Sequence, residues 1–203
     1  MDTQMETPVL YGWFHWVSLA AVLAVSVYLG VFRKGDSPTQ IRRTVLLTAI
    51  VVTVLEVYKQ INYSFSYTDG ITYDYQWYAF PFQFCSTPMY IGLLAGLTKK
   101  GKIHEAACAY LATYAVFAGA CVMLYPSTVF IGTVGINIQT VVCHGSMIFI
   151  GVYLLATGYV KVQHKTILKA IPVFAICVAI AAVGNEIAYR MGLLNTEDFN
   201  MFF

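Results

Sequence analysis

Six apolar stretches, each close to the length of a membrane-spanning helix, dominate the chain. They run from Leu10 to Phe32, Val45 to Phe65, Tyr78 to Leu97, Ala106 to Tyr125, Gly132 to Tyr159 and Ile167 to Tyr189. A helix needs about 20 residues to cross about 30 Å of hydrocarbon, and the stretches meet that length. Hydrophobic residues make up 59% of the chain, charged residues make up 11%, and the mean hydropathy is +0.67. The sequence therefore predicts an integral membrane protein, an all-α polytopic bundle of six transmembrane helices.

The connections between these stretches are short, and none is long enough to form a soluble module. No stretch has low complexity, and no internal repeat recurs at a fixed period. We therefore expect residues 1–203 to form a single transmembrane domain. A removable signal peptide is not expected, because the first stretch carries His15 and has neither a basic segment before it nor a small-residue cleavage site after it. Any site must form between packed helices.

The basic residues predict the orientation of the chain in the membrane. Most of them lie in or beside the first, third and fifth connections, namely Arg33, Lys34, Arg42, Arg43, Lys99, Lys100, Lys102, Lys161, Lys165 and Lys169. The N-terminus and the second and fourth connections carry none. The positive-inside rule therefore places the N-terminus outside. The chain returns outside after the sixth stretch, and a seventh helix that is missing or truncated stays an open alternative.

A few polar side chains inside the apolar stretches lie at a similar depth. Counted from the outer ends, Cys85, His144, Glu56 and His15 lie about 5 to 12 residues in, roughly 8 to 18 Å at the helical rise. The same outer half contains Lys59, Gln60, Gln83, Asn137, Gln139, Asn185 and Glu186. Ionisable residues are costly in hydrocarbon and usually face a functional protein interior. Because the inner halves are almost entirely aliphatic, we expect a cavity that opens outward rather than a continuous channel.

The second stretch carries a polar stripe near its outer end. Glu56, Lys59, Gln60 and Tyr63 are spaced i, i+3, i+4 and i+7, so they share one face of a helix. The Glu56 carboxylate and the Lys59 ammonium can pair within that helix. We expect the stripe to face the bundle interior, where the pair is either a structural ion pair or part of a site.

In the third stretch, Pro81 and Pro88 flank Cys85. Proline lacks a backbone donor, and its ring crowds the carbonyl of the residue four positions earlier. Because Thr87 is a good cap and proline a good first helical residue, we predict a break or a new helix start near Ser86. Amides at a helix start favour negative charge, which would activate the thiol or stabilise an oxyanion. A proline kink shaped only for packing is the alternative.

The remaining candidates have simpler explanations. Four other cysteines are expected to be packing residues, namely Cys108, Cys121, Cys143 and Cys177. No cysteine lies outside the apolar stretches, so a structural disulfide is not expected. A histidine such as His144 or His15 can simply bond a backbone carbonyl, and Glu186 is expected to pair with Arg190 one turn later. No group of residues has the spacing of a metal site.

Several of these positions together resemble a known family. They are the run from Phe80 to Cys85, the pair Glu56 and Lys59, the dipeptide His144-Gly145, and the ending Asn200-Met201-Phe202. In these positions the chain is similar to the bacterial YwaF-type integral membrane proteins, which are similar in turn to the vertebrate transmembrane-protein-164 acyltransferases. The resemblance implies a location in a bacterial-type plasma membrane, and fatty-acyl transfer between phospholipids through a cysteine and a histidine on separate helices. Those catalytic roles fall on Cys85 and His144.

The residues are chemically suited to that reaction without the resemblance. Cys85 can attack a phospholipid ester and hold the acyl group as a thioester. His144 would take the thiol proton, protonate the departing lysophospholipid and then activate the acceptor hydroxyl. The expected partners are therefore phospholipid and lysophospholipid substrates in the bilayer, with no cofactor. The oligomeric state stays open.

Supporting or substrate-binding roles are expected for Glu56, Lys59, Gln83, Ser86, Asn137, His15 and Asn185. Asn137 or Glu56 would fix the imidazole tautomer of His144. Gln83, or backbone amides near Ser86, would stabilise the oxyanion.

Other functions remain open from the sequence alone. His15 and His144 could be the axial ligands of one haem in an electron-transfer protein. A transporter could use the kinked third helix and the Glu56 and Lys59 pair along a small-molecule or proton path, although the inner halves are not polar. A hydrolase that uses water as the acyl acceptor is a variant of the first hypothesis. Nucleic-acid binding is not expected, because membrane topology accounts for the basic residues.

Overall fold

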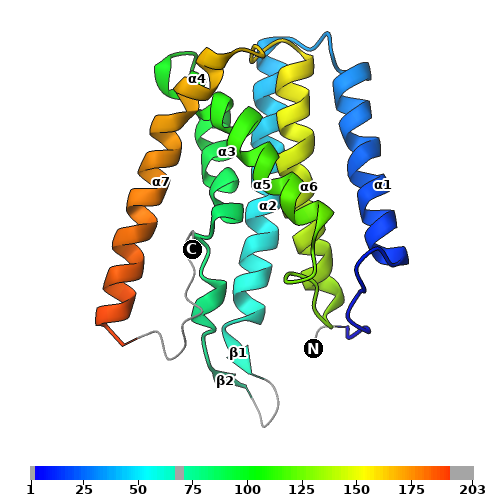
Figure 1. Ribbon diagram of the computed structural model, residues 1–203, viewed down its shortest axis with the longest axis vertical. Helices are drawn as coiled ribbons and strands as arrows, with labels where there is room; N and C mark the ends of the chain where they lie inside the picture. The colour runs from blue at the N-terminus through cyan, green and yellow to red at the C-terminus, as the bar shows by residue number, and fades with distance from the viewer. Residues whose placement is uncertain (1–2, 67–70, 193–203) are drawn as a thin grey trace.

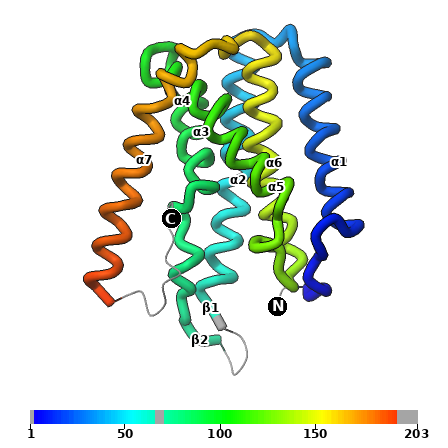
Figure 2. Tube along the Cα trace, in the orientation of Figure 1, coloured from blue at the N-terminus to red at the C-terminus, as the bar shows by residue number. Residues whose placement is uncertain are grey.

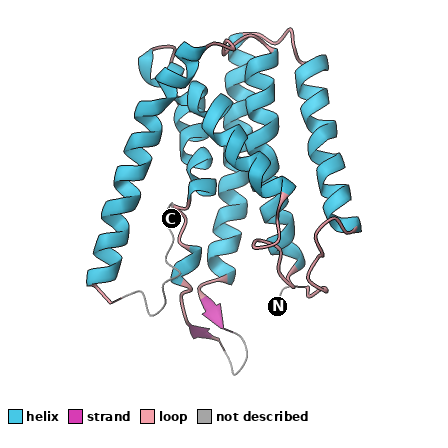
Figure 3. Ribbon diagram, viewed as in Figure 1, coloured by secondary structure: helices cyan, strands magenta, loops and turns pink. Residues whose placement is uncertain are grey.

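The chain folds as a bundle of helices, shown in Figure 1. The computed structural model describes residues 3–66 and 71–192. The α-helices are α1 Trp13–Val27, α2 Pro38–Asn62, α3 Thr87–Leu97, α4 Lys102–Tyr110, α5 Val116–Leu124, α6 Val134–Ala156 and α7 His164–Arg190. A two-stranded hairpin of β1 Phe65–Ser66 and β2 Thr72–Tyr73 follows α2 (Figure 3). The predicted all-α bundle is confirmed.

Five helical segments of the described residues are long and apolar enough to cross a membrane. They are Trp13–Phe32, Pro38–Asn62, Lys102–Leu124, Val134–Ala156 and His164–Arg190. Short π-helical turns, η1 Tyr28–Phe32 and η4 Leu111–Ala115, complete the first segment and join α4 to α5. A shorter apolar helical segment, Phe84–Leu97, supplies the remaining predicted crossing.

The third crossing differs from the prediction, which started its helix at Tyr78. A separate 3₁₀ turn, η2 Trp77–Ala79, comes first, and a second one, η3 Phe84–Ser86, leads directly into α3. The helix therefore begins at Thr87 with Pro88 in its first turn, as expected for a residue that cannot donate a backbone hydrogen bond. The predicted break near Ser86 is confirmed, and it is what makes this crossing short.

Helix α6 lies among α1, α2 and α5, whereas α7 packs on α4 at the opposite side of the bundle from α1 (Figure 2). Two glycines allow the close contacts of α6. A Cβ atom on Gly145 would lie 2.5 Å from Val22 of α1, and one on Gly119 of α5 would lie 2.7 Å from the backbone oxygen of His144. Small residues let membrane helices approach this closely.

The two ends of the bundle differ in charge. The connections from α1 to α2, from α3 to α4 and from α6 to α7 meet at one end, at the top of Figure 1. We call this end the basic end because these three connections carry most of the basic residues that predict the orientation of the chain, including Arg33, Lys100 and Lys161. The hairpin and the described N-terminal segment lie at the other end. That the basic end faces the cytoplasm stays a prediction of the positive-inside rule.

Candidate functional site

A cavity of about 210 Å³ opens at the end of the bundle away from the basic end. Its walls come from α2, from the segment that contains η2 and η3, from the connection before α6, and from α6 itself. Six of the residues predicted for a site line it, namely Glu56, Lys59, Gln83, Cys85, Ser86 and His144. Three others, namely Asn137, His15 and Asn185, are not among the lining residues.

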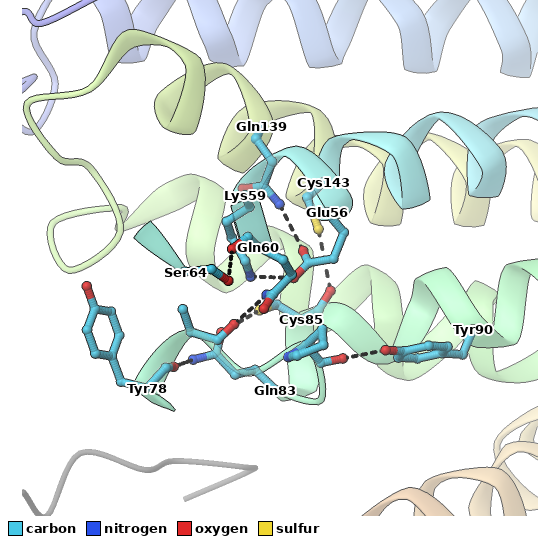
Figure 4. Close-up of polar contacts among 12 residues, drawn as sticks. Glu56, Lys59, Gln60, Ser64, Tyr78, Gln83, Cys85, Tyr90, Gln139 and Cys143 are labelled. Atoms are coloured by element: carbon cyan, nitrogen blue, oxygen red, sulfur yellow. Dashed lines mark hydrogen bonds and ion pairs between the residues drawn. The ribbon is translucent and has the colours of Figure 1, made fainter. Parts of the chain in front are cut away.

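Cys85 lies in the 3₁₀ turn η3, one side of which faces this cavity. Its thiol donates a weak hydrogen bond of 3.7 Å to Oε1 of Gln83, whose Nε2 donates to the carbonyl of Tyr78 at 2.8 Å (Figure 4). The side-chain amide of Gln83 is therefore held in place with its oxygen toward the thiol. Ser86, the N-cap residue of α3, has a buried hydroxyl with no hydrogen-bond partner in the described part of the chain.

Cys85 also lines an apolar crevice of about 20 Å³ on its other side. Met89 and Met147 form part of that crevice. A volume of this size has room for about one water molecule, so the crevice is a seam between side chains rather than an open tunnel. The thiol thus lies where a polar cavity meets the apolar interior of the bundle.

Cys143 borders both spaces, which the sequence did not predict. Its thiol donates to the backbone carbonyl of Cys85 at 3.6 Å (Figure 4). The sequence predicts a packing role for Cys143, and helical geometry turns it by about 100° from His144. Two adjacent helical residues can nevertheless line one cavity when its wall spans more than one face of the helix.

His144 lies on α6 and is 5% exposed. Its Nδ1 atom is 2.8 Å from the carbonyl oxygen of Thr140. Because a carbonyl oxygen can only accept a hydrogen bond, the geometry assigns the proton to Nδ1 and the lone pair to Nε2. The Nε2 atom is buried and has no hydrogen-bond partner among the described residues. The expectation that Asn137 or Glu56 fixes this tautomer is wrong, because Thr140 of the same helix does so.

Cys85 and His144 line the same cavity from different elements, but no hydrogen bond joins them in the described structure. The thiol proton is directed to Gln83, and the basic nitrogen of the imidazole is available. Catalytic hydrogen bonds are often loose before substrate binds, so this geometry is compatible with a nucleophile and a base that meet only with substrate present.

Glu56 organises a buried polar network beside the two residues. Its Oε1 is 2.7 Å from Nζ of Lys59 and accepts from Nε2 of Gln60 at 2.8 Å, and its Oε2 accepts from Nε2 of Gln139 at 3.2 Å (Figure 4). The predicted ion pair within α2 is therefore present, and it faces the interior. Gln139 extends the network to α6, a link that residue spacing within one helix could not reveal.

The segment between β2 and η3, which contains Tyr75 and Tyr78, is hydrogen-bonded to this network through Gln60. The hydroxyl of Tyr75 donates to Oε1 of Gln60 at 2.7 Å, and Nε2 of Gln60 donates to the carbonyl of Ala79 at 2.7 Å. Burial raises the pKa of Tyr75 to about 12 and also raises the pKa of Tyr78, which lines the cavity. Both phenols therefore stay protonated at neutral pH.

Asn137 has a structural role. Its side chain is fully buried, donates to the carbonyl of Ile131 at 2.6 Å and accepts from the Ile131 amide at 3.0 Å. It fixes the turn that precedes α6 and contributes to the site only by placing that helix.

His15 is also structural, and the haem hypothesis gains no support from it. Its Nε2 donates to the carbonyl of Met123 at 2.8 Å, and its Nδ1 accepts from the amide of Tyr11 at 3.0 Å. Both ring nitrogens are therefore engaged within the protein. Asn185 is half-buried on α7, and the neighbouring Glu186 forms the predicted ion pair with Arg190 at 2.6 Å.

Comparison with known proteins adds one finding. The model of the TMEM164 family matches residues 10–203, almost the whole chain. No curated protein matches the sequence, and no solved structure matches it.

Proposed function

The chain belongs to the TMEM164 family, and from this premise and the cavity geometry we propose that it is a membrane-embedded acyltransferase with Cys85 as nucleophile and His144 as base. One observation carries the proposal. His144 lines the same cavity as Cys85, and its buried Nε2, which bears the lone pair, has no partner among the described residues. A buried imidazole nitrogen without a partner is costly, and a general base must keep such a lone pair available.

The first half of the reaction forms a thioester. Nε2 of His144 takes the thiol proton, and the sulfur of Cys85 attacks the ester carbonyl of a phospholipid. The tetrahedral intermediate collapses, the carbon–oxygen bond of the ester breaks, and the leaving lysophospholipid oxygen takes the proton from His144. Ser86 lines the cavity, and its buried hydroxyl, which has no partner among the described residues, is the proposed donor to the oxyanion.

The second half returns the enzyme to its starting state. His144 removes the proton from the hydroxyl of an acceptor lysophospholipid, and that oxygen attacks the thioester carbonyl. The carbon–sulfur bond breaks, and the thiolate of Cys85 takes back a proton from the imidazolium. Water in place of the acceptor would give hydrolysis, so exclusion of water decides between the two outcomes.

The surroundings of Cys85 suit a substrate with one polar and one apolar part. The polar cavity would hold the ester and headgroup, and the acyl chain would enter the apolar crevice on the other side of the thiol. That crevice is too narrow for a chain as it stands. Its lining includes Met89 and Met147, whose unbranched side chains rearrange more easily than branched ones.

Intact-mass spectrometry with a labelled phospholipid donor and no acceptor tests the proposal. We expect an added acyl mass on the wild-type protein that neutral hydroxylamine removes. Cys85→Ala should abolish the adduct, and His144→Ala should slow its formation by about 100-fold or more, the usual contribution of a general base. Addition of a lysophospholipid should discharge the adduct into a new phospholipid, whereas discharge without an acceptor would indicate a hydrolase.

Cys143→Ala is the matched control, because this thiol lines the same cavity but has no nucleophilic role in the proposal. It should keep the adduct. An adduct that persists in Cys85→Ala and disappears in Cys143→Ala would show that Cys143, and not Cys85, is the nucleophile. No adduct in any sample, with the donor shown to bind, would overturn acyl transfer and leave a binding or transport protein.

A further inference from the structure

A second and larger cavity, of about 450 Å³, lies at the basic end of the bundle. Its walls are the start of α2, the connection between α3 and α4, helix α4, the connection between α6 and α7, and the first turns of α7. None of its lining residues also lines the cavity of Cys85 and His144. The two cavities are therefore separate.

The charges around this cavity are predominantly positive. Lys100, Lys161 and Lys169 line it, and Glu105 is the one acidic residue among its described lining residues. Glu105 pairs with Lys169 at 2.7 Å, and the structure shows no ion pair for Lys100 or Lys161 within the described ranges. Membrane topology explains basic residues at this end but not why three of them line one hollow.

The floor of the cavity is a fixed polar group. His104 is 2% exposed, its Nδ1 lies 2.9 Å from the carbonyl of Ala95, and its Nε2 lies 2.7 Å from the hydroxyl of Tyr159. In the neutral imidazole the carbonyl assigns the proton to Nδ1, and Nε2 then accepts from the hydroxyl of Tyr159. The floor thus adds no negative charge to oppose an anion.

A further positive charge lies behind this floor. Arg42 adjoins a seam with His104 and Tyr159, and its guanidinium donates to the carbonyl of Gly96 at 3.2 Å. Its Nε atom is buried and has no partner in the described structure. No carboxylate pairs with Arg42 among the described residues, so its charge adds to the potential in the cavity.

The cavity also lies beside apolar surface. Ile103 on the first turn of α4 and Leu168 on the first turns of α7 are exposed, 65% and 58% respectively. Both are located at the end of a membrane-spanning segment, where hydrocarbon gives way to headgroups. A ligand with a phosphate group and acyl chains matches a basic hollow flanked by such residues, and basic pockets between transmembrane helices are a known form of site for anionic lipids.

We propose that this cavity binds a phosphate group, carried by the headgroup of an anionic phospholipid in the leaflet at the basic end. Lys100 and Lys161, which form no ion pair with any of the described residues, provide the charge, and the apolar surface of α4 and α7 accommodates the acyl chains. A small soluble phosphate ester offers the same phosphate chemistry without the chains. The two sources differ in whether the apolar surface contributes to binding.

Native mass spectrometry of the full chain in detergent, titrated with phosphatidylglycerol or phosphatidylcholine, tests the proposal. Phosphatidylglycerol should bind at the lower concentration. Lys100→Gln/Lys161→Gln should weaken that binding about five-fold per lysine, the effect of removing one cation near a membrane surface. In a competition arm, glycerol 3-phosphate should displace the lipid only at a concentration at least ten-fold higher.

The matched control is Lys102→Gln/Lys165→Gln, which removes the same charge from the first turns of α4 and α7, close to Lys100 and Lys161 in sequence, at residues that do not line the cavity. It should leave the affinity for phosphatidylglycerol within about two-fold. Equal weakening by both pairs, or equal affinity for the two lipids, would overturn the site. Displacement by glycerol 3-phosphate at concentrations similar to that of the lipid would keep the phosphate assignment and overturn the lipid as its source. Loss of acyl transfer in the earlier experiment would leave all of these outcomes unchanged.

Discussion

Gln139 on α6 donates a hydrogen bond of 3.2 Å to Glu56 on α2, across 83 positions of sequence. The same carboxylate holds Lys59 at 2.7 Å. One buried charge pair therefore connects the helix of His144 to a neighbouring helix close to the cavity. This connection gives the Glu56 network a structural role whatever chemistry occurs beside it.

Glu56→Gln should destabilise the fold. The substitution keeps the size of the side chain but leaves the ammonium of Lys59, a residue that is 9% exposed, without its counter-charge. Loss of one partner of a buried ion pair costs about 3 kcal/mol. Denaturant unfolding of the variant in detergent micelles measures this loss.

Glu56→Gln/Lys59→Met is the control for that prediction. Removal of both charges eliminates the unpaired ammonium, so the double variant should be more stable than the single one and within about 1 kcal/mol of wild type. If the double variant is as unstable as Glu56→Gln, the pair is not what stabilises this end of the bundle.

Gly119→Ala should destabilise the protein and disturb the site. The new Cβ atom would lie 2.7 Å from the backbone oxygen of His144 and 2.8 Å from Cβ of Met147. Neither atom is the end of a flexible chain, so α5 and α6 must move apart, at a cost of about 2 kcal/mol. A lower thermal midpoint and a slower acyl-adduct reaction should appear together.

Gly30→Ala is the matched control for the glycine prediction. Its Cβ atom would meet Ala156 and Val152 at 3.5 Å, which is ordinary contact. The better helix propensity of alanine should then leave the thermal midpoint unchanged or slightly raised. Similar losses in both variants would show that packing distance does not set the cost.

His15→Ala should destabilise the bundle by about 3 kcal/mol, because it leaves the Met123 carbonyl and the Tyr11 amide without partners and opens a cavity. His15→Gln retains an amide donor and should lose less. Thermal unfolding gives both values. The adduct on Cys85 should still form in each folded variant, and its selective loss would place His15 in the chemistry.

Asp36 at the basic end should make stability depend on pH. The guanidinium of Arg33, which hydrogen-bonds and pairs with this carboxylate, and the hydroxyl of Tyr153, which donates to it, lower its pKa below the usual value. A lowered pKa in the folded state adds stability above the unfolded-state pKa of about 3.9. That contribution is lost as the pH falls through the lower folded-state pKa.

Asp36→Asn isolates this effect. Thermal midpoints measured from pH 7 down to pH 2 should differ most between wild type and variant above about pH 4, and should converge at the acidic end. A constant difference across the range would mean that the carboxylate charge contributes nothing to stability.

The helical spans were largely predictable, because each depends on local composition and length. The N-terminal boundary of α2 was not predicted correctly from the second apolar stretch. The apolar run begins at Val45, whereas the helix begins at Pro38, where Ser37 and Gln40 form a capping box. Hydropathy does not detect a polar first turn of a helix, but the cap residues indicate it. This boundary could therefore have been predicted from the sequence.

The candidate site was predictable only in part. Counting residues from the helix ends predicted a similar depth for Cys85, Glu56 and His144, and in the structure all three line one cavity. Depth also selected His15 and Asn137, which hold backbone carbonyls elsewhere at similar levels. A polar residue at the right depth can serve the chemistry or the fold, and its helix periodicity does not decide which.

The sequence by itself determined that this protein is a bundle of membrane-spanning helices, that the third is broken beside Cys85, and how deep each polar residue lies. These properties depend on hydropathy, length and proline chemistry, all of which act locally. Only the tertiary structure decided which faces meet: that Cys143 borders Cys85, that Thr140 fixes the tautomer of His144, and that Gln139 reaches Glu56. Rotation and neighbours of a helix are set by close packing between distant segments, which no single stretch of sequence encodes.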